Sequence, residues 1–180
     1  MKILQINAVC GSGSTGRIAA GISRALAGSG HDCLVAYGRG GAPGDIGSFK
    51  CGGDAGVYLH GALSRITGRQ GFYSRAATKR LIRKAEEFCP DVIHLHNLHG
   101  YYLYLPALFR WLAAAGRPVV WTLHDCWAFT GYCAYFDAAG CERWRTGCRD
   151  CPQKREYPAS FFADGSAKNY RDKRKLFTLP

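Results

Sequence analysis

Residues 2–16, KILQINAVCGSGSTG, run from an apolar segment straight into a glycine-rich turn. The apolar residues Lys2–Val9 are typical of a buried strand, and residues 16–27 repeat apolar side chains at helical spacing. A strand, a glycine turn and a helix in this order form a common binding unit for phosphate groups. The turn has the spacing G-x-G-x-x-G, provided by Gly11, Gly13 and Gly16.

The rest of the chain continues the alternation of strands and helices. Strands are predicted at residues 33–37, 92–95 and 119–123, helices at 55–66, 74–88 and 102–115, and a loop at the glycine-rich residues 38–56. Strands separated by helix-length segments favour an α/β fold with a Rossmann-like, doubly wound parallel sheet. With 180 residues and 47% apolar composition, we expect one domain over residues 1–180. A cysteine-rich loop at about residues 126–158 is expected as an appendage to it.

Ligands of such sheets bind beyond the carboxyl ends of the strands. Three polar stretches fall at these ends, at residues 7–16, 94–100 and 124–130, and we expect them to share one cleft. Two histidines two positions apart on a strand point to the same side, as His94 and His96 should. The neutral imidazole of a histidine such as His124 can hydrogen-bond a sugar hydroxyl or carry a proton.

The glycine turn by itself allows several interpretations. A dinucleotide site needs an acidic residue after the second strand, where this chain has Arg39, which would instead suit the extra phosphate of NADP. A nucleoside-triphosphate loop needs Lys and Ser or Thr where Arg17 and Ile18 stand. An NADP-dependent reductase therefore stays open, as does a tight turn without any ligand.

The formal charge of +11 calls for an acidic partner. Basic residues gather at 65–84, 143–155 and 168–175, which suits an anionic membrane surface. We do not expect nucleic acid as a partner, because no recognised reading motif is present. Neither a leader nor a membrane-spanning segment is found, so a cytoplasmic protein, peripheral at the inner face of the membrane, is expected.

Four of the five cysteines in the cysteine-rich loop form a cluster, the last pair as C-x-x-C-P. Four thiolates within one loop can form a tetrahedral structural zinc site. Disulfides or free thiols in a small core are the alternatives, since the other spacings are irregular. The candidate ligands are Cys133, Cys141, Cys148 and Cys151.

Four blocks of the chain closely resemble the amino-terminal half of group 1 glycosyltransferases, which are retaining enzymes of the GT-B fold. They are NAVCGSGSTGRIA (7–19), DVIHLHNLHG (91–100), VVWTLHDCWAFTGYCAYF (119–136) and CERWRTGCRDCPQ (141–153). The resemblance spans nearly the whole chain, and its T-L-H-D-x-W-x-F-T-G block is specific to a subset of the family. Many members build bacterial exopolysaccharide, capsule or lipopolysaccharide.

The resemblance implies a hexosyltransferase-type enzyme. It moves a sugar from a nucleotide-diphosphate sugar to a glycan or lipid-linked acceptor, keeps the anomeric configuration, and requires no cofactor for catalysis. His124, which contacts the transferred sugar, and Asp125 are the implied catalytic residues, and the glycine turn lies by the donor diphosphate and the acceptor. The implied binding residues are Gly11, Ser12, Gly13, Ser14, Thr15, Gly16, Arg17, His96, Asn97, His99, Trp127 and Thr130.

Family members hold the nucleotide-sugar mainly with a second, carboxy-terminal domain that carries basic residues and paired glutamates. The printed chain stops at Pro180, about where that domain would begin. We therefore expect the donor-binding domain to be absent and this chain alone to be an inactive truncation. A non-enzymatic basic binding module is the remaining alternative.

Overall fold

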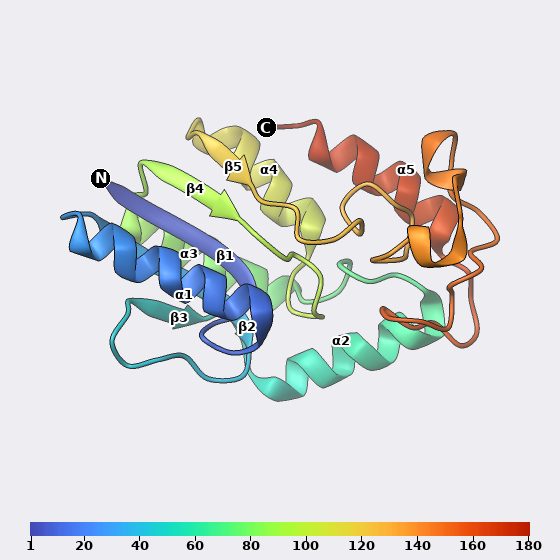
Figure 1. Cartoon of the computed structure of the whole chain (residues 1–180), viewed down its shortest axis with the longest axis horizontal. Helices are drawn as coiled ribbons and strands as arrows, with labels where there is room; N and C mark the ends of the chain where they lie inside the picture. The colour runs from blue at the N-terminus through green and yellow to red at the C-terminus, as the bar shows by residue number, and fades with distance from the viewer.

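The computed structural model describes residues 1–180 as an α/β fold around one parallel sheet (Figure 1). The strand order is β3-β2-β1-β4-β5, and every neighbouring pair is parallel. This is the order of a Rossmann-like sheet, so the predicted fold class is confirmed. The elements are β1 (Lys2–Val9), α1 (Gly13–Gly28), β2 (Asp32–Arg39), β3 (Ser48–Lys50), α2 (Asp54–Thr67), α3 (Arg75–Phe88), β4 (Val92–Leu95), α4 (Leu105–Ala115), β5 (Val119–Trp121) and α5 (Ser166–Phe177).

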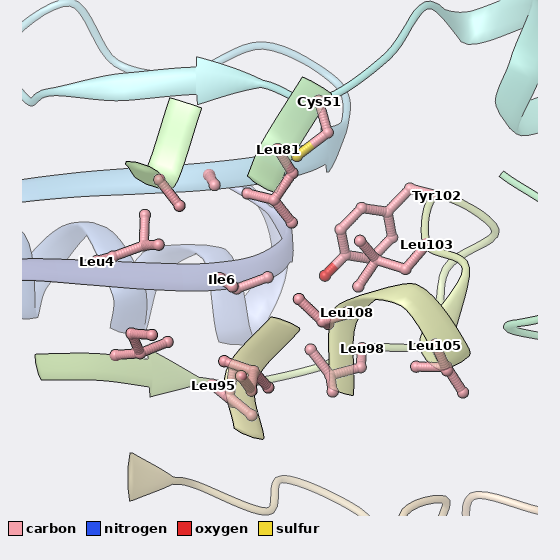
Figure 2. Close-up of a cluster of buried hydrophobic side chains, with 14 of the residues drawn as sticks. Leu4, Ile6, Cys51, Leu81, Leu95, Leu98, Tyr102, Leu103, Leu105 and Leu108 are labelled. Atoms are coloured by element: carbon pink, nitrogen blue, oxygen red, sulfur yellow. The ribbon is translucent and has the colours of Figure 1, made fainter. Parts of the chain in front are cut away.

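Helices cover both faces of the sheet (Figure 1). Successive side chains of a strand point to opposite faces. Leu4 and Ile6 of β1 therefore join the main core with Leu81 of α3 and Leu108 of α4, as Figure 2 shows. Gln5, between them, turns the other way and donates a hydrogen bond to a carbonyl of α1. The polar face of β1 is thus placed against the helix that follows the glycine turn.

Two elements were missed in the sequence. The three-residue strand β3 lies inside the predicted loop at residues 38–56 and pairs with β2, being too short to show an alternating pattern. Helix α5 occupies the basic tail, whose charges mask a buried side formed by Ser166, Asn169 and Lys173. Strand β5 also ends at Trp121, two residues before the predicted end.

The expected cysteine-rich appendage is not confirmed, because contacts tie both ends of the loop to the rest of the domain. It contains two single-turn 3₁₀ helices, at Asp137–Ala139 and Arg143–Arg145, and lies beside α5 (Figure 1). Trp127 belongs to the main hydrophobic core. Ser160, just after the loop, donates a hydrogen bond to the Arg65 carbonyl of α2. None of the helices in the structure has the length and apolar character to span a bilayer.

Candidate functional site

The candidate site lies at the carboxyl ends of β1, β4 and β5. Strands β2 and β3 extend the sheet on one side of β1, and β4 and β5 extend it on the other side. The boundary between β1 and β4 is therefore a topological switch point. Buried Asn7 ties the site together: its Oδ1 accepts from the Asn97 N–H at 3.2 Å, and its Nδ2 donates to the Val9 carbonyl at 2.9 Å and to Thr15 Oγ1 at 3.4 Å. Asn7 thus links two of the polar stretches that were predicted to share one cleft, residues 7–16 and 94–100.

The glycine turn leaves backbone amides free at the start of α1. Gly11 has φ +73° and a Cβ there would lie 2.4 Å from Pro43 Cγ, so only glycine fits. The first turn of α1 carries no acidic residue and no side-chain cap. Ser12, Ser14 and Arg17 are exposed around it. Free N–H groups, the positive end of the helix dipole and one arginine together suit a phosphate.

A buried hydrogen-bond relay leads from the sheet to His124. The Gln5 amide nitrogen donates to the Ala19 carbonyl at 3.0 Å and to Cys33 Sγ at 3.2 Å, so Gln5 Oε1 is the acceptor for His96 Nε2 at 2.9 Å. His96 therefore carries its proton on Nε2. Its Nδ1 then accepts from His124 Nε2–H at 3.0 Å.

This relay assigns a tautomer to His124. Because its Nε2 holds the proton, its Nδ1 is an unprotonated acceptor. Burial lowers the pKa of His124, nearby His99 lowers it further, and Asp125 opposes both. Burial together with the neighbouring histidines lowers the pKa of His96 to about 3. Two neutral imidazoles thus meet at the mouth of the sheet, and the half-buried one, His124, can accept a proton or a hydrogen bond.

Asp125 is fully engaged within the protein. Its Oδ2 lies 2.7 Å from His99 Nε2, and its Oδ1 accepts from the Trp127 N–H at 2.9 Å. Burial acts to raise the pKa of Asp125, but nearby His99, the Trp127 N–H and Lys173 together outweigh burial, so the pKa is lowered. His99 also pairs with the Tyr157 hydroxyl at 3.1 Å. These contacts make Asp125 an anchor of the turn that holds His124.

The predicted site residues divide by accessibility. The turn residues Ser12, Gly13, Ser14 and Arg17 are exposed, and His124 is half-buried. His96 and His99 are buried and act through His124 and Asp125. Two predicted ligand contacts lie away from the cleft surface: Trp127 is 3% exposed within the main core, and Thr130 is 1% exposed and donates to the Cys133 carbonyl at 2.6 Å. Both side chains pack the loop inside the protein.

A basic cavity opens beside the glycine turn. Its volume is about 240 Å³, and Arg39, Arg65 and Tyr101 are among its lining residues, as is Asp54, whose carboxylate pairs with Lys50 at 2.8 Å. Neither arginine forms an ion pair, and the Arg39 Nε is buried without a hydrogen-bond partner. Unpaired guanidinium groups in an open cavity fit an anionic ligand group. Arg65 was not foreseen as a site residue, because one arginine in a helical pattern carries no signal of its own.

The four clustered cysteines all line one small cavity in the loop before α5. Every cysteine of the chain is a free thiol in the structure. Cys148 Sγ accepts a hydrogen bond from the Gly131 N–H at 3.1 Å. No three His, Cys, Asp or Glu side chains are arranged to hold a metal ion. The four thiols therefore share a cavity but are not arranged as metal ligands, and zinc remains a prediction.

Two buried histidines should make the fold sensitive to acid. Burial lowers the pKa of His60 to about 4 and, with the neighbouring histidines, that of His96 to about 3, against about 6.5 in an unfolded chain. Below pH 6.5 these two histidines therefore bind protons in the unfolded chain but stay neutral in the folded chain. We expect each histidine to remove up to about 1.4 kcal/mol of unfolding free energy per pH unit between pH 6.5 and 4.

Urea unfolding at pH 7.5, 6 and 5 checks this expectation. His60 Nε2 accepts from the Gly71 N–H at 3.1 Å and its Nδ1 lies 2.7 Å from Ser74 Oγ, contacts that an amide can imitate. The variant His60→Gln should lose stability less steeply with falling pH than the unaltered chain. Equal slopes for the two proteins would show that His60 is not buried as a neutral group.

Comparison with known proteins identifies relatives of one kind. Residues 15–151 match the family described as Glycosyltransferase Family 4. A protein of Escherichia coli (strain K12), WcaC, provisionally described as a colanic acid biosynthesis glycosyl transferase, is 41% identical over 93 residues, which cover 49% of this chain and 22% of WcaC. The chain thus spans about a fifth of the length of this curated relative.

Among solved structures, the Streptomyces sp. SF2575 glycosyltransferase SsfS6 is similar in two crystal structures. The one complexed with thymidine diphosphate has a TM-score of 0.44 at 16% identity and covers 69% of this chain and 39% of SsfS6. The other has a TM-score of 0.38 at 18% identity, over 69% of this chain and 40% of SsfS6. Likenesses this distant support no conclusion about the site.

Proposed function

The chain belongs to Glycosyltransferase Family 4, and from this membership we propose that it is the acceptor-side domain of a sugar-transferring enzyme. The donor is a nucleotide-diphosphate sugar and the acceptor a glycan or lipid-linked sugar. The description of WcaC supports cell-surface polysaccharide synthesis as the setting. One observation carries the proposal: a neutral, half-buried His124 lies at the same sheet edge as an exposed glycine turn with free amides. Family membership favours this role over an NADP-dependent reductase or a non-enzymatic binding module.

The proposed reaction passes through an oxocarbenium-like state with a departing diphosphate. Such a reaction mainly needs orientation of the reactants and stabilisation of the leaving group's charge. The exposed amides at the start of α1 and Arg17 face that charge, while His124 Nδ1 accepts a hydrogen bond from a sugar hydroxyl. Transfer is proposed to keep the anomeric configuration of a hexose. Since positive charge comes from the chain itself, this step needs no resident cofactor.

The basic cavity suits the acceptor. Arg39 and Arg65 are unpaired there, and a lipid-linked acceptor carries phosphate that such guanidinium groups bind well. Exposed basic residues on α3 extend the positive surface, which we propose faces an anionic membrane at its cytoplasmic side; they are Arg75, Lys79, Arg80 and Arg83. Nucleic acid is not proposed as a partner.

One half of the catalytic cleft is formed by residues 1–180 in this proposal. The other half would come from a second domain that binds the nucleotide, in keeping with the 22% of WcaC that this chain spans. We therefore expect residues 1–180 alone to be inactive, and a longer protein that contains them to transfer sugar.

A transfer assay tests the proposal. A protein containing residues 1–180 followed by a nucleotide-binding domain is given radiolabelled UDP-, GDP- and TDP-sugars, with lipid-linked acceptor in vesicles of anionic or neutral lipid. We expect labelled product from one donor, more of it with anionic vesicles, and none with residues 1–180 alone. Transfer by the isolated chain would disprove the two-domain arrangement, and absence of transfer with every donor would contradict the enzymatic role.

A further inference from the structure

A cavity of about 420 Å³ lies between α2 and α3. This volume falls within the range of small-molecule sites, which is about 300–1,000 Å³. Neither the glycine turn nor the segment of His124 contributes a lining residue. The sugar transfer proposed above therefore leaves this cavity without a role.

The wall of the cavity is mainly apolar. Val57 and Leu63 line it from α2, and Ala76 and Ala77 line it from α3. His60, also in the wall, is 1% exposed, and both of its ring nitrogens are already in hydrogen bonds within the protein. Such a wall favours a hydrocarbon chain, because a sugar or a nucleotide would lose its hydrogen bonds to water there.

Two arginines of α3 give the cavity a positive rim. Arg75 and Arg80 are exposed lining residues, and no carboxylate lines the cavity. Neither arginine forms an ion pair. Arg75 Nη2 donates to the Tyr104 hydroxyl at 3.1 Å, and its guanidinium carbon lies 4.4 Å from the centroid of that ring. This contact orients Arg75 and leaves its charge unpaired, as suits a phosphate group.

The cavity opens beside an exposed apolar surface. Leu59 lines the cavity and is nevertheless 62% exposed, and Tyr58 beside it is 77% exposed. Ile66, about two helical turns further along α2, is 52% exposed. Phe161, 53% exposed, lies at that end of α2, because its N–H donates to the Arg65 carbonyl at 2.8 Å. Large apolar side chains exposed together are typical of a contact surface, and the arginines beside them favour an anionic lipid surface as the partner.

We propose that the cavity between α2 and α3 binds one hydrocarbon chain of a lipid phosphate, with Arg75 and Arg80 holding the phosphate at its rim. The exposed apolar side chains of α2 contact the bilayer, so that the chain enters the cavity without crossing water. The lipid is bound and released unchanged, and it holds the domain on the membrane. The inference rests on the proposed membrane contact for its source of lipid, but it does not depend on sugar transfer.

Calorimetric titration of residues 1–180 with decyl phosphate, below the concentration at which it forms micelles, tests the site. We expect one decyl phosphate per chain, bound about tenfold more tightly than octyl phosphate because two more CH₂ groups are buried. Inorganic phosphate at the same concentrations should not bind measurably. Inorganic phosphate bound as tightly as decyl phosphate would show an anion site without a lipid chain and would overturn the proposal.

A pair of charge variants separates this site from general attraction between charges. Arg80→Gln should weaken the binding of decyl phosphate about tenfold or more, since one charge-assisted contact is lost. Arg83 is the matched control, because it is exposed on the same helix but does not line the cavity. Arg83→Gln should change the affinity less than about twofold. Equal losses in the two variants would contradict the site.

A pair of tryptophan variants tests the cavity itself. Ala76 is exposed and lines the cavity, whereas Ala62 is exposed on α2 and does not line it. Ala76→Trp should weaken binding at least about tenfold, and Ala62→Trp should keep it. Both variants should unfold in urea as the unaltered chain does, because substitutions at exposed positions change stability little. Equal binding by the two variants would overturn the proposal, and, since no sugar donor is present, would leave the proposed sugar transfer to its own assay.

Discussion

The variant His124→Ala should lower the kcat of the intact sugar-transferring protein about 100-fold or more. The hydrogen-bond relay leaves His124 Nδ1 as an unprotonated acceptor at the carboxyl ends of the strands, where the free amides of the glycine turn also lie. Losing one oriented group that acts on the transition state typically costs about 10²–10³ in rate. Stability should change little, because the His124 side chain is half-buried and makes one hydrogen bond.

The matched control for this variant is His31→Ala. His31 directly precedes β2, at the amino ends of the strands and so away from the site, and its ring forms one hydrogen bond, with the amino terminus at 3.4 Å. Its kcat should stay within about twofold of the unaltered protein, since it cannot reach the reactants. Initial rates at saturating donor, with unfolding curves for both variants, make the comparison. Equal rates for the two variants would show that His124 takes no part in the reaction.

The variant Gln5→Leu should lower both the free energy of unfolding and kcat, although Gln5 itself does not reach the site surface. Gln5 is fully buried, and its Oε1 is the acceptor that fixes the proton of His96 on Nε2. Leucine would leave the His96 Nε2–H without its acceptor, which costs about 1–3 kcal/mol. With His96 free to change tautomer, His124 loses its orientation, and kcat should fall about tenfold or more.

Nitrogen NMR of the histidine rings separates positioning from simple instability. In the unaltered chain the ¹⁵N shifts should show His124 protonated on Nε2, and in Gln5→Leu a mixture of both tautomers. Gln70→Leu is the control, because Gln70 is also buried but forms no hydrogen bond with Gln5, His96 or His124. It should keep the tautomer and the rate. An unchanged His124 tautomer in Gln5→Leu would show that the relay does not control it.

The strongest local patterns predicted the frame of the fold. The apolar run of β1 and the glycines behind it predicted the first strand, the turn and the first helix, because strand period and glycine conformation are local properties. The helix begins at Gly13, three residues before the predicted start. Strand β3 has three residues, too few for a period to appear. Helix α5 was hidden because only three of its residues are buried among many charges. Burial of that kind is decided by partners far away in the chain.

In the site, too, local patterns could be predicted from the sequence, whereas contacts between distant residues could not. The spacing of His94 and His96 predicted rings on one side of a strand, and their ring centroids lie 4.0 Å apart. The partner that fixes the His96 proton is Gln5, 91 residues earlier, and nothing local marks it except a polar residue inside an apolar strand. Trp127 and Thr130 sit within a conspicuous motif, yet both are buried. A motif places a loop, whereas the packing of the loop decides which side chains face a ligand.

Hydrogen–deuterium exchange of the intact protein, with and without the nucleotide-sugar that supports turnover, would locate the ligand. If transfer occurs at the carboxyl ends of β1, β4 and β5, protection should appear together on residues 10–17 and 122–126, the glycine turn and the segment of His124. The chain offers a built-in comparison in its cavity of about 420 Å³ between α2 and α3, lined in part by Gly52, Arg75 and Arg80. Protection confined to that cavity, with none at the glycine turn or His124, would contradict the proposed site.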